Sequence, residues 1–291
     1  WMTLVDPLSL AEALGVRPGE PAPPPTALPR DIVLLDVRTS VLDPDAGPRL
    51  WAEGHVPGAV HAHMDRDLSA KPTARTGRNP VPDLYDFIDT CSRWGVAPGT
   101  QVVAYDDKGG VFASRAWWLL RDYGHLEVAV LDGGLPAWLE AGLPVTQEVR
   151  TLPAAKFQGR PGHMKTVSSW DLITRMPRRL MDARAPSRYK GEEDPVNPVK
   201  GHIVGARNLP TDDTLDEKGR FLPPEVLRAK FEGQLQGLPA RDAAVYCGSG
   251  ITSPHLILAM EVAGLYGAAL YPGSWSEWIK DPRRPVGKGE E

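Results

Sequence analysis

Cysteine is scarce in this sequence: the 291 residues include only two, Cys91 and Cys247. Two cysteines so far apart cannot form the disulfide framework of a small secreted domain, and they lack the spacing of a zinc site. We therefore expect a reducing, cytoplasmic location and no metal site.

The sequence also lacks a long apolar run and an excess of basic charge. No stretch approaches the roughly 18 apolar residues that a membrane-spanning helix needs, and the first residues do not have the composition of a signal peptide. The net charge is −4, from 33 basic and 37 acidic side chains, which argues against nucleic acid or a membrane surface as a partner. These properties predict a soluble globular protein.

Strand-like and helix-like segments alternate along the chain. Short apolar runs at 31–36 and 101–105 predict strands, and the periodic segments 83–94 and 110–123 predict helices. The polar, turn-rich stretch 65–82 is expected to be a surface loop. This alternation is typical of a parallel sheet covered by helices on both faces, the α/β class.

The motifs of the first half return in the second half in the same order. The matching pairs are LLDVR at 34–38 with LMDAR at 180–184, GHVPGA at 54–59 with GHIVGA at 201–206, VVAYD at 102–106 with AAVYC at 243–247, and DGGLPAW at 132–138 with PGSWSEW at 272–278. A repeat of this length predicts two tandem α/β domains, residues 1–150 and 151–291. The Pro/Gly-rich segment 143–164 is the expected connector.

The second copy carries Cys247 between a predicted strand and a predicted helix. Ser253 is a good helix N-cap and Pro254 suits the first helical position, so residues 247–252 form a loop. Amide groups in a tight, glycine-containing loop and at a helix N-terminus stabilise an anion. We therefore expect a lowered pKa for the Cys247 thiol and a thiolate nucleophile at the mouth of the loop. The alternative is a buried, inert cysteine at a strand end.

The corresponding position in the first copy is Asp106. A carboxylate cannot do thiol chemistry, so we expect the first domain to be a scaffold and the second domain to be catalytic. Asp106 itself is interpreted as a turn residue.

Taken together, these motifs resemble the tandem-domain rhodanese superfamily, the sulfurtransferases. The paired GHVPGA and GHIVGA, the DGG turn, the loop CGSGIT and the terminal YPGSWSEW occur in family order over residues 32–286. In this family, thiosulfate sulfurtransferases usually carry basic residues directly after the cysteine, whereas 3-mercaptopyruvate sulfurtransferases carry Cys-Gly-Ser-Gly-Val-Thr. The loop here is similar to the second type, with Ile251 in place of valine.

The resemblance implies two rhodanese-like domains and a double-displacement reaction. The Cys247 thiolate would attack the sulfur of 3-mercaptopyruvate, hold it as a persulfide, and pass it to cyanide, a small thiol or thioredoxin. The backbone of Gly248, Gly250, Ile251 and Thr252 would bind the sulfur anion, and no metal or organic cofactor is needed. We expect the enzyme to be a monomer. The alternatives are thiosulfate as the donor, through the same persulfide, and a non-enzymatic sulfur carrier or sensor.

The resemblance also implies that Arg188 binds the carboxylate or sulfonate of the donor, which suits a guanidinium fork. The mercaptopyruvate enzymes have a second arginine nine residues further on, where this chain has Asn197, and Lys200 is a candidate substitute.

Two further residues match groups proposed for proton handling at the substrate carbonyl, Ser249 and His55. Asp43 or Asp45 could supply the carboxylate that assists the histidine. The competing interpretation of His55 is a turn cap that stabilises domain packing.

A cysteine-dependent phosphatase is a further class to weigh, but its loop needs an arginine six residues after the cysteine, and here that residue is Ser253. Other conspicuous residues are expected to be structural: Cys91, His202, Trp275, Trp278, and the ion-pair candidates Asp36, Arg38, Asp182 and Arg184.

Overall fold

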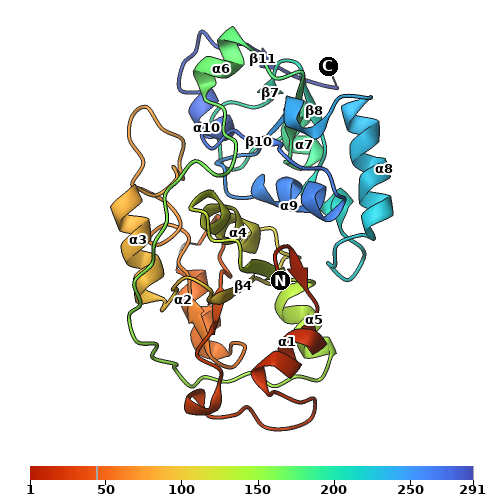
Figure 1. Ribbon diagram of the computed structural model, residues 1–291. Helices are drawn as coiled ribbons and strands as arrows, with labels where there is room; N and C mark the ends of the chain where they lie inside the picture. The colour runs from red at the N-terminus through yellow and green to blue at the C-terminus, as the bar shows by residue number, and fades with distance from the viewer. Residues whose placement is uncertain (44, 291) are drawn as a thin grey trace. The chain divides into compact units, whose positions relative to one another are not determined.

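The computed structural model describes residues 1–43 and 45–290 and divides into two compact units (Figure 1). The first unit comprises Trp1–Ser69, Pro82–His163 and Glu217–Phe221, and the second comprises Ala70–Val81, Met164–Asp216 and Leu222–Glu291. The main division, between His163 and Met164, falls at the end of the expected connector. Each unit also includes a short segment from the other half of the sequence, Glu217–Phe221 in the first and Ala70–Val81 in the second. The expected domain limit at residue 150 stays a prediction.

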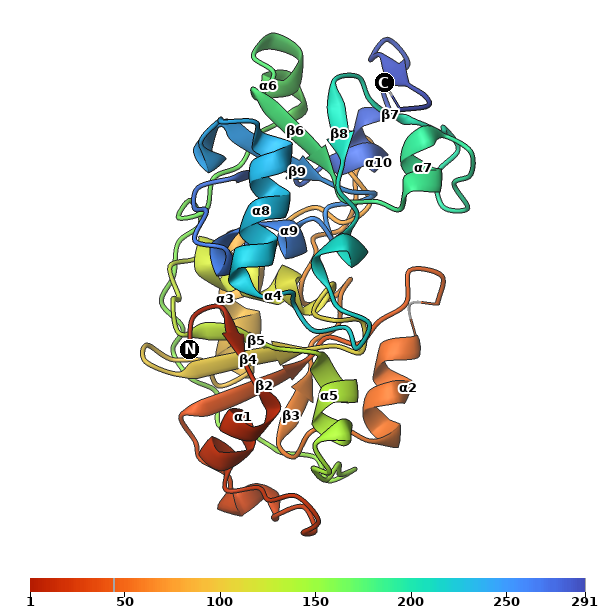
Figure 2. The ribbon, with the colours of Figure 1, turned by 90° about the vertical axis from the view of Figure 1, so that its right-hand side faces the viewer.

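The first unit is built on a five-stranded sheet with the order β1-β5-β4-β2-β3, in which every pair is parallel (Figure 2). Its strands are β1 (Leu4–Val5), β2 (Ile32–Asp36), β3 (Ala59–His61), β4 (Gln101–Tyr105) and β5 (Val128–Leu131). Its helices are α1 (Pro7–Leu14), α2 (Ala46–Glu53), α3 (Leu84–Arg93), α4 (Ala113–Asp122) and α5 (Gly134–Glu140), with a 3-10 turn at Pro25–Ala27. The strands and helices expected at 31–36, 83–94, 101–105 and 110–123 are confirmed.

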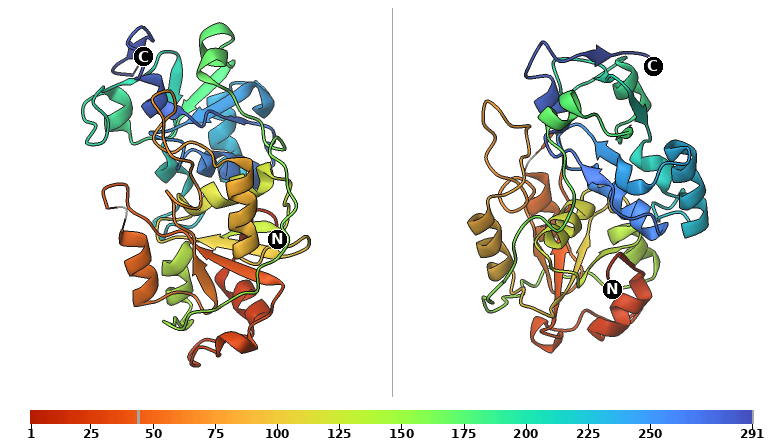
Figure 3. Two further views of the ribbon diagram at one scale, coloured as in Figure 1. Left: turned by 90° about the vertical axis from the view of Figure 1, so that its left-hand side faces the viewer. Right: turned by 45° about the horizontal axis from the view of Figure 1, so that its top comes forward.

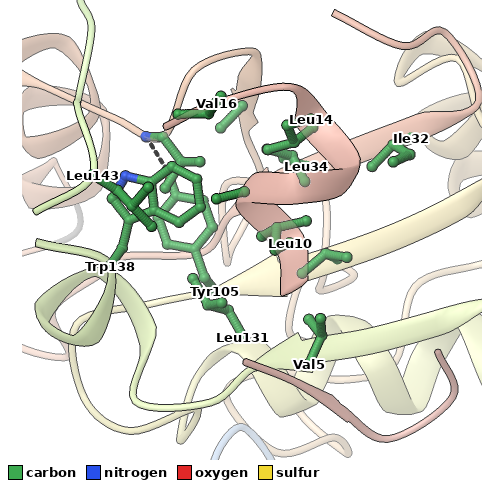
Figure 4. Close-up of a cluster of buried hydrophobic side chains, with 14 of the residues drawn as sticks. Val5, Leu10, Leu14, Val16, Ile32, Leu34, Tyr105, Leu131, Trp138 and Leu143 are labelled. Carbon is green, nitrogen blue, oxygen red and sulfur yellow. Dashed lines mark hydrogen bonds between the residues drawn. The ribbon is translucent and has the colours of Figure 1, made fainter. Parts of the chain in front are cut away.

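One face of this sheet packs against α1 and α5. Leu10 and Leu14 of α1 and Trp138 of α5 lie in one buried cluster with Leu34 and Tyr105 of the strands (Figure 4). Because side chains alternate along a strand, the neighbouring residues of β2, β4 and β5 face the other side, and they are buried too. Burial on both faces explains why these strands are apolar throughout, as the α/β class requires.

The second unit repeats this plan with a four-stranded parallel sheet of order β10-β9-β6-β8. Its strands are β6 (Arg179–Asp182), β8 (Ala206–Asn208), β9 (Ala243–Tyr246) and β10 (Ala269–Leu270), and a separate antiparallel pair joins β7 (His202–Ile203) to β11 (Val286–Gly287). The helices are α6 (Ser169–Thr174), α7 (Pro186–Lys190), α8 (Pro224–Leu235), α9 (Pro254–Val262) and α10 (Ser274–Trp278), with 3-10 turns at Thr211–Thr214 and Ala240–Asp242. The predicted mainly parallel α/β architecture is therefore confirmed.

The two copies share a buried ion pair that ties the end of a strand to the glycine motif. Arg38 donates to Asp36 at 2.6 Å and to Gly54 O at 2.7 Å. In the second copy Arg184 donates to Asp182 at 2.5 Å and to Gly201 O at 2.8 Å. Both expected pairs are confirmed.

The other residues expected to be structural are also buried. Cys91, Trp275 and Trp278 are at most 1% exposed. Each tryptophan donates its indole N–H to a backbone carbonyl, that of Val199 or Pro285, at 2.9 Å. None of the helices described is long and apolar enough to cross a bilayer.

The segment 65–82 differs from the expected surface loop, because part of it is buried in the second unit. The backbone of this segment passes beside the blue helix α10 (Figure 3, left). Arg78 N donates to Ser276 Oγ of that helix at 3.0 Å. A Cβ atom at Gly77 would lie 2.4 Å from Gly273 O, so only glycine fits this close approach of two backbones. Polar composition alone did not reveal that these residues pack against α10.

Candidate active-site loop

Cys247 lies directly after β9, at the start of a loop that leads into α9. Gly250 N donates to Cys247 Sγ at 3.2 Å. Gly250 has φ 86°, and a Cβ there would lie 2.2 Å from Pro272 O. Only glycine meets both demands, so this residue is required for the loop to close around the sulfur.

The environment of the sulfur lowers the pKa of the thiol. Burial would raise the pKa of Cys247, but the side chains of Thr252 and Ser253 and the amides of Ser249 and Ser253 act in the opposite direction and outweigh it. Groups that donate hydrogen bonds to the charged form favour that form. The lowered pKa expected from the sequence is confirmed.

Burial, by contrast, differs from the expectation of a cysteine at the open mouth of a loop, since Cys247 is only 2% exposed. The pKa of the thiol distinguishes Cys247 from the other buried cysteine, Cys91. That residue is also buried, and burial raises the pKa of its thiol well above the ordinary value. The two cysteines differ in the donors around the sulfur.

Ser253 occupies the N-cap position of α9, as expected, but does not act as a cap. Its backbone is helical, with φ −64° and ψ −28°, and its side chain makes no capping hydrogen bond. The buried hydroxyl of Ser253 is thus not used to cap the helix. It instead lowers the pKa of the Cys247 thiol.

The first unit shows the same loop around a carboxyl group, whose pKa burial raises although four amides act in the opposite direction. The two carboxylate oxygens of Asp106 accept four backbone N–H groups, from Lys108 at 2.8 Å, Gly110 at 2.9 Å, Phe112 at 2.7 Å and Ala113 at 2.8 Å. Asp106 is therefore more than the turn residue expected, because its carboxylate fills the amide cradle of its loop. Lys108 and Phe112 correspond in the repeat to Ser249 and Ser253, whose amides act on Cys247.

Arg188, on α7, lies beside the loop. A Cβ at Gly248 would be 3.2 Å from Arg188 Nη2, so this glycine leaves room for the guanidinium. Arg188 Nη2 donates to Asp194 at 3.2 Å. Burial raises the pKa of Asp194, but the Asn197 side chain and the charge of Arg188 outweigh it and hold that pKa below its usual value. Asp194 therefore stays ionised and holds Arg188 against the loop.

A second guanidinium reaches the same place from a residue that sequence reasoning missed. Arg78 Nη2 lies 3.6 Å from the position of a Cβ at Gly248, and Arg78 Nη1 donates to Asn197 Oδ1. Burial, and then the positive charge of Arg188, lower the pKa of Arg78, while Cys247 acts in the opposite direction. Asn197, at the position of the family's second arginine, thus holds an arginine from elsewhere in the chain.

The other expected residues are placed as follows. Ser249 and Ile251 are buried within the loop. Lys200 does not join the arginines: its ammonium donates to Glu192 O at 3.0 Å and its side chain is exposed. Asp43 pairs with Arg49 at 2.5 Å.

His55 belongs to the first unit and is buried. Its ring nitrogens lie 2.8 Å from Trp51 O and 3.3 Å from Glu148 O, and its ring stacks on Trp51. In the second unit His202 has the same arrangement, 2.8 Å from Tyr189 O and stacked on that tyrosine. Among the described residues neither Asp43 nor Asp45 hydrogen-bonds to His55. The arrangement favours the packing role, and a catalytic role for His55 stays a prediction.

Metal-binding side chains do not gather anywhere in residues 1–43 and 45–290: no group of three or more His, Cys, Asp or Glu is placed to hold an ion.

Comparison with known proteins supports the repeat. The model of the rhodanese-like domain matches residues 27–141 and 169–281. A probable 3-mercaptopyruvate sulfurtransferase of Pseudomonas aeruginosa is 43% identical over 289 residues, covering 97% of this chain and 98% of that protein. The thiosulfate sulfurtransferase of Rattus norvegicus is 33% identical over 250 residues, covering 82% and 83%.

Solved structures give the same result for the fold. The 3-mercaptopyruvate sulfurtransferase from Leishmania major matches with a TM-score of 0.82 at 28% identity, covering 97% of this chain and 75% of that one. The resemblance inferred from the motifs is thus confirmed over both halves. With two copies of the domain and relatives of this kind along almost its full length, the chain belongs to the rhodanese-like family and is a sulfurtransferase.

Proposed function

We propose that this enzyme moves a sulfane sulfur from 3-mercaptopyruvate to a thiophilic acceptor through a persulfide on Cys247. The observation that carries the proposal is a thiol with a lowered pKa, held by amide and hydroxyl donors beside two guanidinium groups. The thiolate is the reactive form of a cysteine, and this loop favours it.

In the first half-reaction the Cys247 thiolate attacks the sulfur of the donor, and a new S–S bond forms. The C–S bond breaks, its electron pair stays on the carbon, and the resulting enolate takes up a proton to give pyruvate. We assign that proton transfer to the Ser249 hydroxyl, which belongs to the same loop. The amide of Gly250 and the hydroxyls of Thr252 and Ser253 then stabilise the persulfide anion, since they already favour a negative sulfur.

In the second half-reaction the acceptor attacks the outer sulfur. The S–S bond breaks, and the Cys247 thiolate returns to its amide donors. Cyanide, a small thiol or reduced thioredoxin can each serve as the nucleophile, and a loop that stabilises the departing thiolate helps all of them.

Donor binding is assigned to Arg188 and Arg78. Both guanidinium groups stand against Gly248, next to the nucleophile, and two such forks suit a carboxylate with a neighbouring keto oxygen. Asp194 offsets the charge of Arg188, whereas Asn197 fixes Arg78 with a neutral amide and leaves its charge for the donor. The same arginines can bind a sulfonate, so thiosulfate is the second candidate donor.

The setting of the reaction is part of the proposal. Both cysteines are free thiols and one must be reduced to react, which suits action in the cytoplasm. We propose that the enzyme acts there as a monomer, which size-exclusion chromatography with light scattering would check.

The test compares kcat/KM for 3-mercaptopyruvate and thiosulfate with cyanide as the common acceptor. We expect 3-mercaptopyruvate to give the higher value, and Cys247→Ser to abolish transfer from both donors with an unchanged Tm, because the change is nearly isosteric. Cys91→Ser is the matched control, with the same atom changed at a buried thiol, and should keep full activity. Turnover by Cys247→Ser would refute the assignment of the nucleophile, and a higher kcat/KM for thiosulfate would refute the assignment of the donor.

A further inference from the structure

A second pair of arginines lies on β6 and β8, neighbouring strands of the same sheet. Arg179 begins β6 and is in register with Ala243 at the start of β9, whereas Cys247 follows the end of β9. Arg207 lies in the middle of β8, the edge strand (Figure 2). Both line a pocket of about 660 Å³. The pocket is separate from the cysteine loop, and nothing in the sulfur-transfer reaction accounts for it.

The two guanidinium groups share one neutral acceptor. Gln236 Oε1 accepts from Arg207 Nη2 at 2.9 Å and from Arg179 Nη2 at 3.2 Å. Neither arginine has a carboxylate within ion-pair distance among the described residues, and the buried Nε of Arg179 has no acceptor there. Burial, and then the charge of Arg207, lower the pKa of Arg179. Two like charges are thus held together without a counterion of their own.

The residue that holds them is itself in an unfavourable conformation. Gln236 follows α8 with φ 52°, in the left-handed region that glycine adopts most easily. The next residue, Gly237, could have ended the helix in its place. The left-handed backbone of Gln236 is therefore found at the residue whose side chain accepts from both arginines.

The remaining charges in the pocket are Lys190 and Glu290. They form an ion pair at 2.8 Å, and the Glu290 side chain is 81% exposed. Exposed pairs of this kind contribute little to stability and are readily replaced. The walls therefore present three cations and one exchangeable carboxylate, together with polar groups from Asn208 and Gln234.

We propose that this pocket binds an oxyanion, namely the phosphate group of a small phosphorylated molecule or free phosphate. Guanidinium forks match the oxygens of a phosphate, and a dianion supplies the charge that Gln236 lacks. The pocket is larger than a phosphate ion and lies in the range of ordinary small-molecule sites, which leaves room for the rest of an ester.

The experiment titrates the full-length protein with inorganic phosphate and, in a second arm, with glycerol 3-phosphate, by isothermal titration calorimetry. Arg207→Gln should weaken binding about tenfold or more, which is the size expected for the loss of a charge-assisted hydrogen bond. Arg179→Gln, measured independently, should do the same. Arg228→Gln is the matched control, because Arg228 lies on α8, outside the pocket, and pairs with Glu232 at 2.9 Å. It should leave binding unchanged.

A further control separates this pocket from the arginines of the cysteine loop. Arg188→Gln should leave intact the phosphate binding that Arg207→Gln weakens. Phosphate should also raise the Tm of the wild-type protein but not that of Arg207→Gln. Tighter binding of the ester than of phosphate would identify a phosphorylated molecule as the ligand, and equal binding would identify free phosphate. The proposal is overturned by the absence of saturable binding in both arms, or by binding that survives Arg207→Gln and Arg179→Gln.

Discussion

Replacement of Arg78 by glutamine tests how the donor is held. The change removes the charge beside Gly248 but keeps a polar side chain that can still meet Asn197. A hydrogen bond to a charged group contributes about 1.5–3 kcal/mol, so we expect kcat/KM for 3-mercaptopyruvate to fall by about 10- to 100-fold. Because the binding arginine is lost while the nucleophile stays intact, most of the fall should be a rise in KM.

The assay separates the two half-reactions. Steady-state rates with cyanide report donor binding, and single-turnover release of sulfur from the preformed persulfide reports the second step. Arg78→Gln should slow sulfur transfer from the donor to Cys247. It should leave transfer from the persulfide to a neutral thiol acceptor nearly unchanged. Arg75→Gln, an exposed arginine of the same loop, and Lys200→Gln are the controls and should behave like wild type. Equal kcat/KM for Arg78→Gln and Arg75→Gln would refute the assignment of Arg78.

Two other predictions concern the anion cradles. Ser253→Ala removes a hydroxyl that lowers the thiol pKa, so the pH midpoint for alkylation of Cys247 by iodoacetamide, followed by mass spectrometry, should move upward; an unmoved midpoint would contradict this. Because the pKa of the folded thiol is depressed, its stabilising contribution is present above the unfolded pKa and is lost as the pH falls through the folded pKa. Asp106→Ala should lower the free energy of unfolding by about 3–5 kcal/mol in urea titrations, since four buried N–H groups lose a charged acceptor, and Asp107→Ala should change it by less than about 0.5 kcal/mol. Similar losses for both variants would show that the four amides do not need the carboxylate.

Much of the fold could be predicted because the signals are local. The apolar runs of β2 and β4 are buried on both faces, so they read as strands without any knowledge of the rest of the chain. The repeat added the tandem architecture, and the Asp-Arg spacing in both copies identified the buried ion pairs. The lowered pKa of Cys247 followed from the glycine-containing loop that precedes a helix.

The failures have a common cause in long-range packing. Arg78 lies in a polar stretch whose composition resembles a surface loop, and only the folded chain brings it to Asn197. The one available signal was the asparagine at the position of an expected arginine. Ser253 has the sequence of an N-cap, but a capping bond depends on backbone angles that its neighbours decide. His55 matched a motif, yet the motif has the same packing in the copy that carries His202.

The carboxylate in the first loop has a consequence for the second. In one half of the molecule the group that accepts from the amides is a carboxyl group of the chain itself. In the other half the negative group exists only while the sulfur of Cys247 is ionised. The catalytic half therefore completes its own hydrogen bonding only when Cys247 is deprotonated, so we expect its loop to be better ordered above the pKa of the thiol than below it.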